Sequence, residues 1–95
     1  MAVAVVMEFN DGTLDQYDQV IERMGLTPGG AGPPGALFHW TTETDGGVRV
    51  TDVWETREEF DKFAEEKIGP LSAEVGMGAP TNLTFHDVHN HFTAG

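Results

Sequence analysis

His39 and Asp52 are the residues whose types and positions could together carry acid–base chemistry. Asp52 lies in the middle of an apolar stretch that is typical of a central β-strand, where a charged side chain needs a polar partner. If the preceding hairpin has a two-residue loop, either Asp45-Gly46 or Gly46-Gly47, the register places His39 on the same face, directly opposite or diagonal to Asp52. A three-residue loop would place His39 on the other face.

Two interpretations of this pair are open at the level of sequence. In the functional one, Asp52 orients His39, and the imidazole acts as a general base toward an acidic C–H or O–H of a bound substrate. In the structural one, the two residues form a satisfied buried polar pair that fixes the sheet register and the geometry of a dimer. We assign His39 and Asp52 as the candidate catalytic residues.

Three histidines near the C-terminus, His86, His89 and His91, suggest a metal site because imidazole is a common neutral ligand. Within a strand expected over residues 81–92, His89 and His91 would point to one face and His86 to the other, so at most two of them could converge locally. We therefore expect no bound metal, and we treat His86 as a candidate substrate-binding residue.

Three aromatic side chains complete the candidate substrate-binding set. Tyr17 lies on the apolar stripe of a predicted helix, where its phenol could reach a pocket or simply fill the core with its hydroxyl at the rim. Trp40 and Trp54 could stack on a flat aromatic substrate, although large aromatic residues are also expected where two sheets pack together. We expect one of the two tryptophans to line the cavity.

The elements that must position these residues follow one another in the order β-α-β-β-α-β. Thr13 and Thr56 each begin a capping box at the start of an amphipathic helix. Gly25 is placed to end the first helix, and Gly69-Pro70 to stop or kink the second. The helices are expected over residues 14–24 and 57–68, with a further helical turn over 71–75, and the strands over 2–9, 36–44, 49–55 and 81–92.

This order is the split βαβ arrangement of an α+β, ferredoxin-like domain, a four-stranded antiparallel sheet with two helices on one face. The chain of 95 residues is the size of one such domain, residues 1–95. Apolar side chains occur on both faces of the predicted strands, while two helices can cover only one face. We therefore expect a homodimer in which two sheets pack face to face around a cavity.

The overall charge excludes several classes of partner. Sixteen Asp and Glu residues against five Lys and Arg residues give a net charge of −11, which disfavours binding to nucleic acid and to anionic membranes. No cysteine is present, so disulfides, thiolate metal sites and cysteine nucleophiles are excluded. The longest apolar run, residues 2–7, is too short to span a bilayer, and we expect a cytoplasmic protein.

Segments that carry a family resemblance run over nearly the whole chain: Tyr17-Asp18, PPGALFH over 33–39, GGVRVTDVWETREEF over 46–60, Ile68-Gly69-Pro70 and Val88-His89-Asn90. On these segments the chain resembles the dimeric α/β-barrel superfamily, and within it the small actinobacterial proteins related to antibiotic biosynthesis monooxygenases. The resemblance implies a fold shared by cofactor-free oxygenases, haem-degrading enzymes, isomerases and decarboxylases. The haem-degrading pattern, a ligating His on a helix, has no match because both predicted helices lack His.

These observations predict a small homodimeric enzyme that binds a hydrophobic, aromatic or polyketide-like metabolite in a cavity on the open sheet face. We expect it to act without a cofactor, as a cofactor-free monooxygenase or as an isomerase or cyclase. The alternative is a non-catalytic ligand-binding or dimerisation module. A haem- or metal-binding protein that uses the C-terminal histidines is a third hypothesis.

Overall fold

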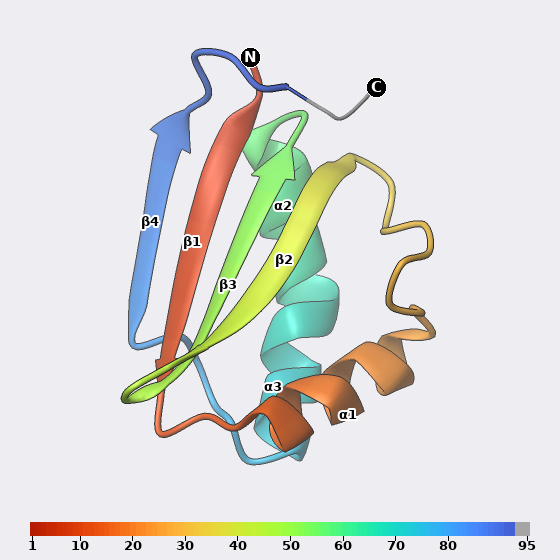
Figure 1. Ribbon diagram of the computed structural model, residues 1–95. Coiled ribbons are helices and arrows are strands. Elements are labelled where there is room, and N and C mark those ends of the chain that lie inside the picture. The colour runs from red at the N-terminus through yellow and green to blue at the C-terminus, as the bar shows by residue number, and fades with distance from the viewer. Residues whose placement is uncertain (93–95) are drawn as a thin grey trace.

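The computed structural model describes residues 1–92 and confirms the predicted order of elements (Figure 1). Its strands are β1 (Val3–Asn10), β2 (Ala36–Thr44), β3 (Gly47–Trp54) and β4 (Asn82–Asp87). Its helical segments are α1 (Leu14–Met24), α2 (Arg57–Phe63), the π-helical turn η1 (Ala64–Ile68) and α3 (Gly69–Glu74). The fold is the predicted α+β, ferredoxin-like arrangement.

The four strands form one antiparallel sheet in the order β2-β3-β1-β4, with β1 and β3 at its centre as predicted. The helical segments lie on one face of this sheet, behind it in Figure 1. No helix from residues 1–92 covers the face that is turned toward the viewer, which we call the open face. A bilayer-crossing helix, which must be both long and apolar, does not occur in this described part of the chain.

The core lies between the sheet and the helices. The odd-numbered residues of β1 from Val3 to Phe9 are all buried on this side, because successive side chains of a strand point to opposite faces. Trp54, at the end of β3, packs edge-on against Phe60 of α2, with ring centroids 5.8 Å apart. These contacts fix α2 on the same face as the buried side chains of β1 and β3.

Helix α1 begins and ends as the sequence predicts. The Thr13 hydroxyl accepts a hydrogen bond from the backbone N–H of Gln16, and the Gln16 side chain accepts one from the Thr13 N–H, each 3.1 Å long. This reciprocal pair is a complete capping box. Gly25 ends the helix in the left-handed conformation, with φ 77°, which glycine adopts without a steric penalty. The ends of α1 are therefore well defined, and with them the position of Tyr17.

The second helix begins at Thr56 with only half of its predicted capping box, because the Glu59 side chain bonds the Thr56 hydroxyl rather than the Thr56 N–H.

This helix continues through Gly69-Pro70 instead of stopping there. Proline in a helix has no N–H to donate, and its ring collides with the carbonyl four residues earlier. The chain adapts with the π turn, in which the Gly69 N–H donates to the carbonyl of Ala64. Helix α3 then forms, close to the further helical turn that the sequence predicts.

Strand β4 is shorter than predicted. The sequence indicates a strand as far as residue 92, whereas β4 ends at Asp87. Val88 donates a last backbone hydrogen bond, 3.0 Å long, to the residue before β1, and the chain beyond it has no strand left to pair with. The predicted placement of His89 and His91 within a strand is therefore wrong.

Gly47, at the start of β3, provides a test of the hairpin. A Cβ atom at this position would collide with the backbone carbonyl oxygen of Phe9, so Gly47→Ala should lower the free energy of unfolding by about 1–3 kcal/mol, the usual range for overpacking. At Gly46 an added Cβ meets no atom within 4 Å, and Gly46→Ala should change the stability by less than about 0.5 kcal/mol. Chemical denaturation measures the unfolding free energy of both variants. Equal losses in Gly47→Ala and Gly46→Ala would contradict the described backbone geometry of the β2–β3 hairpin.

Candidate functional site

The β2–β3 hairpin brings His39 and Asp52 together. The loop between the strands is the two-residue Asp45-Gly46, and the register places His39 directly opposite Asp52. This confirms the alternative in which the loop has two residues. Asp52 also pairs across the sheet with the core residue Val5, so the two side chains meet on the helix-covered face.

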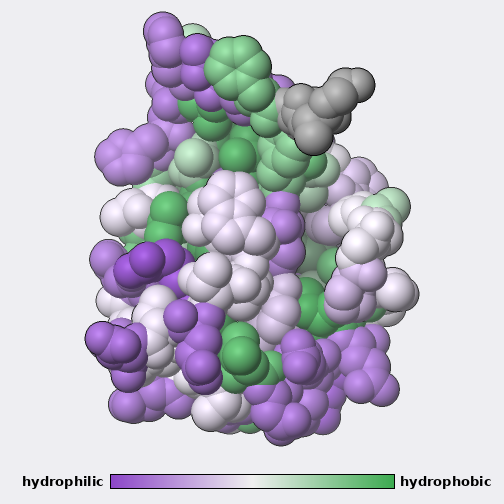
Figure 2. Space-filling model, in the orientation of Figure 1, coloured by the Kyte–Doolittle hydropathy of each residue, from purple (hydrophilic) through white to green (hydrophobic). Residues whose placement is uncertain are grey.

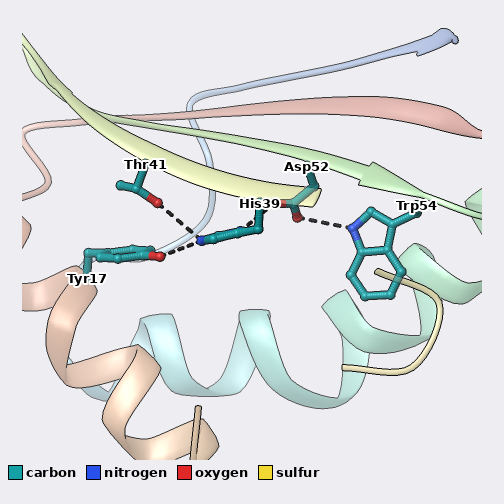
Figure 3. Close-up of polar contacts among 5 residues, drawn as sticks. All are labelled: Tyr17, His39, Thr41, Asp52 and Trp54. Carbon is teal, nitrogen blue, oxygen red and sulfur yellow. Dashed lines mark hydrogen bonds and ion pairs between the residues drawn. The ribbon is translucent and has the colours of Figure 1, made fainter. Parts of the chain in front are cut away.

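Four side chains form a continuous chain of hydrogen bonds on this face (Figure 3). His39 Nδ1 lies 2.5 Å from Asp52 Oδ1, and His39 Nε2 lies 2.5 Å from the hydroxyl oxygen of Tyr17. The second carboxylate oxygen of Asp52 accepts a hydrogen bond from the indole N–H of Trp54 at 3.1 Å. Thr41 adds a fifth group, with its hydroxyl 3.3 Å from His39 Nε2.

The carboxylate of Asp52 determines which imidazole nitrogen carries the proton in a neutral His39. An ionised carboxylate can only accept hydrogen bonds, so His39 Nδ1 must donate. His39 Nε2 is then an acceptor, and the Tyr17 phenol donates to it. In this arrangement a carboxylate orients a histidine for proton abstraction, with Nε2 as the basic nitrogen.

Burial distinguishes the two central members of this chain of groups, Asp52 and His39. The side chain of Asp52 is 6% exposed, and that of His39 is 40% exposed. The carboxylate is stabilised by its hydrogen bonds rather than by water. A ligand can therefore reach the imidazole while the carboxylate stays shielded.

Tyr17 lies in the site rather than in the core alone. Burial raises the pKa of its phenol above the ordinary value of 10.0; a hydrogen bond with Thr41 opposes this, and the negative charges of Asp52 and Asp18 add to it. The phenol is therefore a neutral hydrogen-bond donor at neutral pH. Its ring is nearly parallel to the imidazole of His39, with 10° between the ring planes.

The hydrogen-bonded groups line a cavity of about 600 Å³ between the sheet and the helices of a single chain. Its walls are mainly apolar, with Met7 from the sheet and Val20 and Phe63 from the helices. Residues 27–33, part of the glycine- and proline-rich loop before β2, also line it. This volume is in the usual range for sites that bind small organic molecules.

The cavity lies on the opposite side of the sheet from the predicted one. The sequence placed it on the open face, between two sheets of a dimer, whereas it lies under the helices of one chain. Alternation along a strand shows which residues share a face, but it does not show which face the helices will cover. The candidate site is therefore formed within one chain.

The structure separates the predicted substrate-binding residues. Tyr17 and Trp54 line the cavity beside His39. Trp40 directly follows His39 in β2 and so points to the open face, where it is 52% exposed. His86 lies opposite an outward-facing residue of β1 and also points to the open face. As predicted, one of the two tryptophans, Trp54, lines the cavity, whereas Trp40 and His86 are not among its lining residues.

Thr41 and Ser72 also line the cavity, and neither was predicted as a site residue from the sequence. Thr41 stands two positions from His39 in the same strand, so strand alternation alone places both on one face. Ser72 lines the cavity from α3 and is 1% exposed. Its burial has no sequence signal, because it follows the π turn that interrupts the helical periodicity.

The C-terminal histidines do not assemble a metal site in the described residues. Within residues 1–92, no three His, Asp or Glu side chains are close enough to hold a metal ion together. The ring of His91 packs edge-on against Phe38, with centroids 5.2 Å apart. His86, His89 and His91 are also not among the residues that line the cavity.

No protein-family model matches the chain, and neither does any curated protein. A solved structure from Chloroflexus aurantiacus J-10-fl, provisionally assigned as an antibiotic biosynthesis monooxygenase, superposes with a TM-score of 0.65 at 16% identity and covers 100% of both chains. The monooxygenase from the gene ActVA-Orf6 of Streptomyces coelicolor, solved with the ligand nanaomycin D, superposes with a TM-score of 0.50 at 22% identity. That match covers 99% of this chain and 92% of the other.

The chain has the fold of the antibiotic biosynthesis monooxygenases. The resemblance found in the sequence is thus confirmed at the level of the fold. Its extension to an actinobacterial subgroup stays a prediction. Identities of 16% and 22% establish the fold alone, so the function of the chain is inferred from its own site.

Tyr17 is the only tyrosine of the chain, so its ionisation can be followed by the near-ultraviolet absorbance of tyrosinate. In the folded protein its pKa should lie above the value measured in denaturant, because burial disfavours the phenolate. Asp52→Asn removes a negative charge that raises this pKa, and should lower it. A folded-state titration that coincides with the denatured one would contradict the described environment of Tyr17.

The same pKa shift predicts how stability depends on pH. Because the folded-state pKa of Tyr17 is raised, its contribution to stability is fully present below the unfolded pKa near 10.0. It should be lost as the pH rises through the folded-state value, since the unfolded state releases its proton first. Denaturation curves at increasing alkaline pH should show this loss in the native sequence and not in Tyr17→Phe.

Proposed function

We propose that the cavity binds a hydrophobic, aromatic or polyketide-like metabolite and that His39 removes a proton from it. The observation that carries this proposal is the hydrogen-bonded chain of Tyr17, His39, Asp52 and Trp54 on the wall of a mainly apolar cavity. The apolar walls would hold the rings of the ligand, and the polar groups would fix the position of its acidic C–H or O–H. The absence of a bound organic cofactor stays a prediction from the sequence.

Tyr17 determines the route of the proton. Its hydroxyl already occupies His39 Nε2, and its raised pKa disfavours a free phenolate as the base. A substrate could therefore replace the phenol at Nε2, or give its proton to Tyr17 while Tyr17 gives its own to His39. Both routes leave a protonated imidazole next to the negative charge of Asp52, which stabilises it.

The substrate anion formed in this way can follow two reactions. With dioxygen as the oxidant, a CH₂ group becomes C=O: one oxygen atom is inserted, and the other leaves as water with the two hydrogens. Return of the proton to another carbon gives isomerisation instead. Attack of the substrate carbanion on a carbonyl carbon of the same molecule gives cyclisation, with the proton passing from His39 to the carbonyl oxygen. The monooxygenase names of the two structural neighbours favour the first reaction.

A non-catalytic binding protein is the second candidate function. The close contact between Tyr17 and His39 favours it, because a phenol that stays on His39 Nε2 would block the base. In such a protein the same polar groups would bind an oxygen atom of the ligand without removing a proton. The two candidates differ in what happens when the charge of Asp52 is removed.

Asp52→Asn distinguishes these functions once a thermal-shift screen of metabolites has supplied a substrate. An Asn side chain can keep the Trp54 hydrogen bond, but its amide can donate to His39 Nδ1, which favours the tautomer with a proton on Nε2. In Asp52→Asn, turnover should fall about a hundredfold. The melting temperature should change little, because the substitution preserves the shape of the side chain. His39→Ala should reduce turnover at least as much.

His86→Ala is the matched control for His39→Ala, because His86 lies on the open face; it should keep full turnover. Full activity of both Asp52→Asn and His39→Ala would contradict the proposed base. If the native chain binds ligands without turning them over, and Asp52→Asn and His39→Ala lose that binding, the result would instead support the binding protein.

We further propose that the open face is covered by a second copy of the chain. This face carries Val6, Phe38 and Trp40 along neighbouring strands, and Trp40 is 52% exposed. Figure 2 shows apolar and weakly polar side chains over the upper and central part of the face, and hydrophilic ones along its lower and outer edges. A contiguous exposed apolar patch is unfavourable in water, and face-to-face packing of two sheets would remove it.

Sedimentation equilibrium at micromolar concentration should therefore give twice the mass of one chain. Trp40→Glu places a charge in the centre of the proposed interface and should shift the protein to the monomer. Lys62→Gln makes the same change in net charge on an exposed position of α2, and should leave the dimer intact. A native protein that sediments only as a monomer would contradict the proposed dimer.

A further inference from the structure

Ser72 places an unpaired hydroxyl in the wall of the cavity. It is the only serine of the chain, its residue is 1% exposed, and its Oγ has no hydrogen-bond partner within the described residues. Buried hydroxyl groups in proteins are nearly always hydrogen-bonded, because leaving one unpaired costs free energy. Ser72 is also among the residues that line the cavity.

Ser72 has a hydrogen-bonded backbone carbonyl, and its unpaired group is the side-chain hydroxyl. Its carbonyl accepts hydrogen bonds from the N–H groups of Met77 and Gly78, at 2.9 and 3.1 Å. The residue lies in α3, directly after the π turn. A π turn inserts one residue and so rotates the following side chains by roughly 100° around the helix axis. Ser72 therefore occupies a buried position that an uninterrupted helix would have given to a neighbouring residue.

We propose that Ser72 Oγ binds an oxygen function of the metabolite held in the cavity. This rests on the proposed function, because it takes the cavity to be a ligand site. Ser72 approaches from the helix layer, whereas His39 approaches from the sheet. A ligand that satisfies both needs two oxygen functions on different sides of an apolar ring system, one near His39 and Tyr17, and a carbonyl or hydroxyl at Ser72.

Alanine at this position would fill nearly the same space with no polar atom to satisfy. If the hydroxyl only filled space, Ser72→Ala would leave ligand affinity unchanged. If it bonded a backbone carbonyl in its own helix, as serine side chains can, Ser72→Ala would lower the stability of the free protein. A role in ligand binding predicts a third pattern, an unchanged or higher melting temperature together with weaker binding of selected ligands.

The test compares dihydroxynaphthalene isomers with the two mononaphthols, which offer the same ring system with two oxygen functions or one. Affinities are measured by calorimetric titration. The native chain should bind at least one diol more tightly than the matching naphthol. Ser72→Ala should weaken that diol roughly three- to tenfold, the range for one hydrogen bond, and leave the naphthol unchanged. Ser72→Cys keeps the volume but is a weak donor, and should resemble Ser72→Ala.

Val20→Ala is the control for a change of cavity shape, because Val20 lines the cavity without a polar group; it should change diol and naphthol affinity by similar factors. A Ser72→Ala variant that binds every probe like the native chain, or that melts at a clearly lower temperature, overturns the role of Ser72 and leaves the proposed function standing. Failure of the native chain to bind any probe overturns the ligand cavity and this inference together.

Discussion

A carboxylate buried between a sheet and its helices is the constraint on which the site depends. Asp52 is 4% exposed, and an ionised group in that position is tolerated only with hydrogen-bond donors on its oxygens. Trp54 supplies one donor and His39 the other. Satisfying Asp52 therefore fixes the ring and the tautomer of His39, and the free nitrogen of His39 in turn fixes the phenol of Tyr17.

The two faces of the sheet have separate roles in this account. The helix-covered face holds the cavity and every polar group proposed to act on a ligand. The open face carries Trp40 and is left for association. A change on the open face can thus alter the oligomeric state without reaching His39, which explains why dimerisation and chemistry can be tested independently.

Much of this site could be predicted from sequence, because its central pair depends on short-range rules. Strand alternation and the two-residue loop together set His39 opposite Asp52. Strand alternation also places Trp40, the residue after His39, on the opposite face of the sheet. The predicted substrate-binding set did not take this into account. The face of His86 depends on how β4 pairs with β1, and the burial of Ser72 depends on the π turn. The first is set by pairing between distant segments, and the second by the way the helix adapts to Pro70, and neither is specified by hydrophobic periodicity.

The tautomer of His39 is the most direct test of the central claim. Nitrogen NMR of the imidazole distinguishes a protonated ring nitrogen from one that carries a lone pair. In the neutral ring we expect the proton on Nδ1, strongly shifted downfield by its bond to Asp52, and the lone pair on Nε2. Asp52→Asn should abolish the downfield proton. A native His39 protonated on Nε2, or a ring exchanging freely between tautomers, would contradict the claim that Asp52 orients the base.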